Sequence, residues 1–140
     1  MQLLRLEIIK VLFTGPKAKL LADTLSHPNC SIVELVFDSC RAKSEKMGVL
    51  FEALTRNQSV ANLTLRNMNI PRDSLTVMGD MFCGNKTLQM LTLFNAGLTD
   101  NSIQILSTGL EQSNGLIYLD LRQNNFENLG FQELAKSLTG

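Results

Sequence analysis

A pair of apolar residues recurs along the whole chain at a spacing of 28 or 29 residues. Its copies are Leu6 and Ile8, Leu35 and Phe37, Leu63 and Leu65, Leu91 and Leu93, and Leu119 and Leu121. Five more positions of the repeat keep the same spacing, and each is apolar in all five copies. The one exception is Asn124, a polar residue at one of these positions in the last copy. Such a repeat predicts a solenoid, whose stacked units bury apolar residues against their neighbours. We therefore predict one domain over residues 1–140, built from units 3–31, 32–59, 60–87, 88–115 and 116–140.

Each unit has the pattern of one strand followed by one helix. The paired apolar residues are two positions apart, which places both on one face of a strand. Later apolar residues lie four apart, as at Leu106 and Leu110, and share one face of a helix. Pro16 and Pro71 suit a first helical turn, and Thr99 is a candidate cap. Repeated strand–helix units predict an α/β fold with a parallel sheet.

Two stretches carry a resemblance to a known family. "LIYLDLRQNNF" (116–126) resembles the leucine-rich repeat consensus L-x-x-L-x-L-x-x-N-x-F/L, and "IVELVFDSCRA" (32–42) fits its variant with Cys in the Asn place. The unit length and the spacing of Gly130, Leu134 and Leu138 resemble the ribonuclease-inhibitor-like subclass. The resemblance implies a leucine-rich repeat solenoid, a horseshoe arc with a parallel sheet on the concave side and helices on the convex side. The units are degenerate, because Val11, Met68 and Ala96 fill the Asn place elsewhere.

Strand residues between the core positions point out of the concave face, so recognition can be encoded there. The predicted partner-binding residues are Met90, Phe94, Tyr118, Asp120, Arg122, Arg66, Asn62, Glu34 and Asp38. Aromatic residues and Met beside Arg have the composition of an interface hot spot. The alternative is that these apolar side chains carry no function, because every folded surface exposes some.

These patterns favour a non-catalytic module that recognises a protein partner through its concave face. One alternative, implied by the resemblance, is the repeat segment of an intracellular immune sensor or regulator. Another is a GTPase-activating protein of the Ran type, for which Arg41 and Arg72, expected in turns after strands, are candidate residues. No enzyme site is predicted: His27 is the only His and follows a helix, and no phosphate-binding loop occurs.

Composition excludes several other classes of protein. The net charge is zero, which argues against nucleic acid as a partner, since that needs a clustered basic face. Three Cys without metal-ligand spacing and one His predict no metal site, and no cofactor motif occurs. We interpret the cysteines as reduced thiols of a cytoplasmic protein. The Asn-x-Ser/Thr triplets, which could be glycosylated in a secreted protein, are then expected to occur by chance at Asn29, Asn57, Asn62 and Asn85. The apolar start is broken by charges and predicts neither a leader nor a membrane span.

The terminal units lack the polar caps that a solenoid needs. The fifth unit is the most regular and keeps both Asn124 and Gly130, so it does not look like a cap. We expect further repeats in a longer parent chain, or self-association end to end. The other reading is that the end units cap themselves, with Glu133 in an otherwise apolar column.

Overall fold

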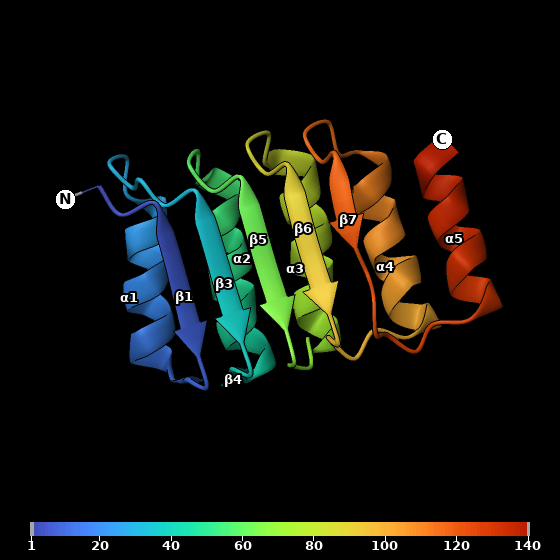
Figure 1. Ribbon diagram of the computed structural model, residues 1–140, viewed down its shortest axis with the longest axis horizontal. Coiled ribbons are helices and arrows are strands. Elements are labelled where there is room, and N and C mark those ends of the chain that lie inside the picture. The colour runs from blue at the N-terminus through green and yellow to red at the C-terminus, as the bar shows by residue number, and fades with distance from the viewer. Residues whose placement is uncertain (1, 140) are drawn as a thin grey trace.

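The computed structural model describes residues 2–139 as a single row of strand–helix units (Figure 1). The main sheet holds five parallel strands in the order β1, β3, β5, β6, β7. Its strands are β1 (Arg5–Ile9), β3 (Glu34–Asp38), β5 (Asn62–Arg66), β6 (Met90–Phe94) and β7 (Tyr118–Asp120). The helices behind it are α1 (Gly15–Ser26), α2 (Ser44–Arg56), α3 (Arg72–Gly84), α4 (Asp100–Glu111) and α5 (Asn128–Thr139). The α/β solenoid inferred from the repeat is confirmed.

The strands pair in the register that the repeat predicts. Leu35 lies opposite Leu6 on one side and Leu63 on the other, and the same column continues through Leu91 and Leu119. Because alternate side chains of a strand point to opposite faces, this register sends one ladder of leucines into the core. The intervening residues form ladders on the opposite face of the sheet.

The core is complete in the middle units and open at both ends. Leu50, Met78 and Leu91 are fully buried between sheet and helices. The apolar columns also predict Leu3 and Leu138 as core residues, but these are 43% and 68% exposed. The physical reason is that each lies on an end face of the row, where no further unit covers it.

The segment after each main strand differs from a plain turn. β2 (Leu12–Phe13) and β4 (Arg41–Ala42) form a second, two-stranded parallel sheet that the sequence patterns do not predict. One non-glycine residue per unit takes a left-handed conformation with φ between 48° and 62°. These residues are Lys10, Ser39, Asn67, Asn95 and Gln123. Their regular recurrence means that every unit turns away from the sheet in the same manner.

Two buried asparagines join successive units at the ends of the helices. The side chain of Asn85 donates to the carbonyl oxygens of Leu54 and Asn57 at 2.6 and 3.2 Å, and its oxygen accepts from the N–H groups of Thr87 and Leu88 at 2.8 and 2.7 Å. Asn57 makes similar contacts one unit earlier: it donates to the carbonyl oxygen of Leu25 and accepts from the N–H groups of Ser59 and Val60. These asparagines are structural, and both are buried.

No helix within residues 2–139 combines the length and the apolar character that crossing a bilayer requires. The three cysteines are free thiols: Cys40 is buried, Cys30 is half-buried and Cys83 is exposed. In the same residues, no group of three or more His, Cys, Asp or Glu side chains is arranged to hold a metal ion.

Candidate functional site

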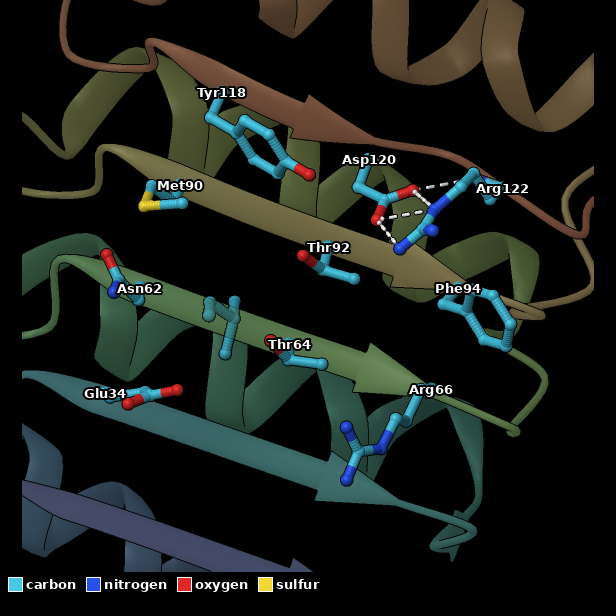
Figure 2. A pocket seen from close by; sticks show the side chains of 11 residues that line it. Glu34, Asn62, Thr64, Arg66, Met90, Thr92, Phe94, Tyr118, Asp120 and Arg122 are labelled. Carbon is cyan, nitrogen blue, oxygen red and sulfur yellow. Dashed lines mark hydrogen bonds and ion pairs between the residues drawn. The ribbon is translucent and has the colours of Figure 1, made fainter.

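Most of the predicted partner-binding residues line one hollow on the open face of the sheet (Figure 2). The hollow has a volume of about 440 Å³ and extends from β3 to β7. Asp38 alone among the predicted residues does not line it. The walls also include Thr64 and Thr92. Alternation with buried leucines predicts both on the outward face, although neither is among the predicted partner-binding residues.

The first three strands carry charges that neutralise one another. Arg66 donates to Asp38 and to Glu7, each at 2.9 Å, although Glu7 lies two strands away. Arg5 donates to Glu7 at 2.8 Å and approaches Glu34 at 3.2 Å. These hydrogen bonds raise the pKa of Arg5 above its ordinary value. A partner that bound here through charge would have to compete with existing ion pairs.

Asp38 anchors this network at the carboxyl end of β3. Hydrogen bonds from the side chains of Asn67, Ser39 and Arg66, in that order of importance, hold the pKa of its carboxyl below the ordinary 3.8. Asn95 in turn donates to Asn67 at 3.1 Å, so the chain of hydrogen bonds continues along the edge of the sheet. The contacts of Asp38 are therefore mainly internal to the protein.

Asp120 and Arg122 form a closed pair in the wall of the hollow. The Arg122 guanidinium donates to both carboxylate oxygens at 2.7 to 3.0 Å, which lowers the pKa of Asp120 and raises that of Arg122. Asp120 is only 6% exposed, whereas the Arg122 side chain is 73% exposed. The guanidinium carbon lies 5.6 Å from the centre of the Phe94 ring, within the range of a cation–π contact. Both residues line the hollow, but the exposed Arg122 offers a ligand far more surface than Asp120 does.

The fourth and fifth strands supply an apolar wall. Met90 and Tyr118 are neighbours in the strand register and are 37% and 46% exposed. Phe94 is half-buried at the other end of β6. Figure 2 shows Met90 and Tyr118 at one end of the hollow, with Phe94 and Arg122 at the other. Within residues 2–139, the Tyr118 hydroxyl makes no hydrogen bond to another residue, so it is available to a partner.

The other singled-out residues lie away from this face. Arg41 is part of β4 and Arg72 is the first residue of α3, so neither sits in a plain turn as the sequence pattern suggested. His27 caps the carboxyl end of α1, where its Nδ1 accepts from the backbone N–H of Asn29. None of these three residues lines the hollow.

No family model matches the chain. Among curated proteins, NACHT, LRR and PYD domains-containing protein 14 of Mus musculus is 31% identical over 122 residues, which cover 86% of this chain and 12% of that protein. NACHT, LRR and PYD domains-containing protein 5 of Mus musculus is 29% identical over 121 residues, or 10% of its length. Leucine-rich repeat-containing protein 45 of Gallus gallus is 28% identical over 107 residues, or 16% of its length.

The chain thus spans about a tenth of the length of the first of these relatives, and the similarity runs through most of its repeats. Both kinds of relative carry the leucine-rich repeat in their names. The parallel ladder of leucines, the helix of each unit and these similarities agree: the chain belongs to the leucine-rich repeat proteins.

Proposed function

We propose that this chain is a non-catalytic protein-interaction module that recognises a protein partner through the concave face of its sheet. The observation that carries the proposal is the apolar wall of Met90, Phe94 and Tyr118 around the hollow of about 440 Å³. Aromatic and Met side chains in a concave surface have the composition of interface hot spots. The self-neutralised charges beside them form a polar rim.

The residues of this wall are not needed to close the core. Met90 and Tyr118 are both more than one third exposed, and the leucines between them supply the buried contacts. Binding would remove this apolar surface from water, which is favourable at roughly 25 cal/mol per Å². Arg122 would add a donor at the edge of the wall, since its exposed guanidinium keeps unused N–H groups.

The test uses affinity capture with the tagged chain, followed by mass spectrometry and by affinity measurement with the captured protein. Combined Met90→Ala and Tyr118→Ala substitution should weaken binding by about thirtyfold, as expected when hot-spot contacts worth about 2 kcal/mol are lost. Leu20→Ala is the matched control, because Leu20 is 69% exposed on α1, away from the sheet face. A partner that binds both variants equally well would refute the concave site.

The second candidate is a repeat segment of an intracellular immune sensor or regulator. The matches to NACHT, LRR and PYD domains-containing proteins favour it, since they cover 86% of this chain. Sequencing the transcript in both directions is the test. An open reading frame that joins this segment to a NACHT module would support the candidate, and a frame with repeats alone would remove it.

A further inference from the structure

The two end faces of the row expose side chains that belong to core columns. Phe131 and Leu138 are 60% and 68% exposed on the fifth unit. In the third and fourth units the place of Phe131 is taken by Leu75 and Ile103, which are buried. At the opposite end Leu3 is 43% exposed, although its equivalents in the second, third and fourth units are at most 5% exposed. These side chains are of the kind that packs against a neighbouring unit, and within residues 2–139 no further unit covers them.

The inner junctions of the row show what these end faces can accept. Every unit places one side against the unit before it and the opposite side against the unit after it. The free side of the fifth unit and the free side of the first unit are therefore the two halves of one such junction. Figure 1 places β1 and β7 at opposite ends of the sheet, with α1 and α5 behind them. A second copy set beyond β7 in the same orientation would bring these halves together.

The backbone at the two ends is complementary in the same way. Ahead of the main strands, one carbonyl oxygen of each unit accepts from two successive N–H groups of the next unit at 2.8 to 3.1 Å. These oxygens belong to Leu4, Val33, Ala61 and Gln89. Ile117 is the next member of the series, and among the described residues its carbonyl oxygen accepts from no backbone N–H group. The N–H groups of Leu4 and Arg5 of another copy would continue the series.

Charge is distributed unevenly along the row. Residues 1–87 hold 11 Lys and Arg against 8 Asp and Glu, whereas residues 88–140 hold 2 against 5. The net charges of these two parts are therefore +3 and −3, and they cancel in the whole chain. A head-to-tail arrangement sets the positive end of one copy beside the negative end of the next, whereas two like ends would repel each other.

We propose that copies of this chain associate head to tail, with the first unit of one copy packed against the fifth unit of another. The contact buries the exposed apolar residues of both faces and continues the parallel sheet from β7 of one copy into β1 of the next. Because the two faces differ, the contact is heterologous and leaves one free face at each end of a pair. Larger assemblies therefore form as the protein concentration rises.

A second copy fits these faces better than an unrelated protein. A unit of the same repeat offers apolar columns, N–H groups at matching positions and a complementary charge together, and the first unit of this chain is such a unit. One side of a single unit is a small interface, so we expect a dissociation constant of about 10 µM.

The test measures the mass of the full 140-residue chain by light scattering and sedimentation, at concentrations from about 1 to 200 µM. The average mass should rise with concentration and pass twice the mass of one chain. A chain that stays monomeric throughout would overturn the proposal, and would indicate that these faces are covered by a further repeat of the same polypeptide. A mass that levels off at that of a dimer would also overturn it, because a closed pair joins like faces.

Two variants each block one face. The first-unit variant combines Leu3→Glu with Leu4→Glu, and the fifth-unit variant combines Phe131→Glu with Leu138→Glu. Each should weaken association at least about tenfold, because the new carboxylates would be buried against apolar side chains. All four residues are exposed in the single chain, so each variant should keep its fold, which circular dichroism checks.

Val33→Glu combined with Val49→Glu is the matched control. It adds the same two charges at exposed positions of the second unit, away from both end faces. The control should change the dissociation constant less than about twofold, since salt screens charges at that distance. An equal loss in the control and in the two face variants would overturn the proposal.

Mixing the two face variants tests the direction of the contact. Each variant keeps one intact face, and the two intact faces are the complementary halves of the junction. An equimolar mixture should therefore form pairs that contain one copy of each variant, and no larger species. A mixture that remains monomeric at concentrations where the unchanged chain associates would overturn the head-to-tail arrangement.

Discussion

Asn85 gives the sharpest test of what holds neighbouring units together. Its amide group donates to two carbonyl oxygens of the preceding unit and accepts from the N–H groups of Thr87 and Leu88. Asn85→Ala would leave two N–H donors without their partner, of which that of Leu88 belongs to a residue 5% exposed. An orphaned buried donor costs about 1 to 3 kcal/mol, so we expect a loss of about 3 kcal/mol in the free energy of unfolding.

That loss should lower the melting temperature by about 10 °C for a domain of this size. Urea unfolding followed by circular dichroism at 222 nm, the usual helix signal, and thermal melts would measure it. Asn62→Ala is the matched control: Asn62 is half-buried on the sheet face, and its side chain makes no hydrogen bond within residues 2–139. It should change stability by less than about 0.5 kcal/mol.

Asn85→Ser provides an intermediate case. The following unit has Ser113 in this place, where the hydroxyl accepts one longer hydrogen bond of 3.4 Å from the Leu116 N–H. Serine at residue 85 should therefore recover part of the stability lost with alanine. If Asn85→Ala cost less than about 1 kcal/mol, or if serine were no better than alanine, the hydrogen bonds would not be what couples the units.

Two further predictions concern helix packing and pH. Gly109→Ala should lower the free energy of unfolding by about 2 to 3 kcal/mol in a urea titration, since a Cβ there would collide with the backbone of Gly79. Gly48→Ala is the control and should be neutral, because its Cβ would meet only an ordinary contact. Similar losses in both variants would contradict the close approach at Gly109. Because the pKa of Asp38 is lowered in the folded state, its carboxylate stabilises the fold above pH 3.8, and this contribution is lost as pH falls through the still lower folded-state pKa. The difference in unfolding free energy between the native chain and Asp38→Asn should therefore be larger at pH 7 than at pH 3. A difference that is the same at both pH values would refute this linkage.

The strand register and the helices could be predicted because a period of 28 residues forces equivalent side chains into equivalent places. Leu63 lies between Leu35 and Leu91 as the repeat requires. The role of Asn57 and Asn85 was missed, although their spacing of 28 residues was visible, because the triplets containing them were considered only as possible modification sites. Their burial depends on where the helices end, which periodicity locates poorly.

The candidate site was only partly predictable for a different reason. The outward strand positions followed from alternation, so the hollow's lining was anticipated. The ion pairs could not be predicted, because a long side chain such as Arg66 can reach several acidic residues. In the structure it pairs with Glu7, two strands away.

The buried asparagines also bear on how much of the molecule opens at once. In a linear array each unit contacts only its neighbours, and the strength of those interfaces decides whether units open singly or together. Asn57 reaches back to Leu25, and Asn85 reaches back to Asn57. Opening any one of these units would break hydrogen bonds in the next. The two asparagines therefore link the first three units into one block for amide exchange. The fourth and fifth units are joined by different groups, since Asn124 accepts from the N–H groups of Ala96 and Leu98 and donates to the carbonyl oxygen of Leu93.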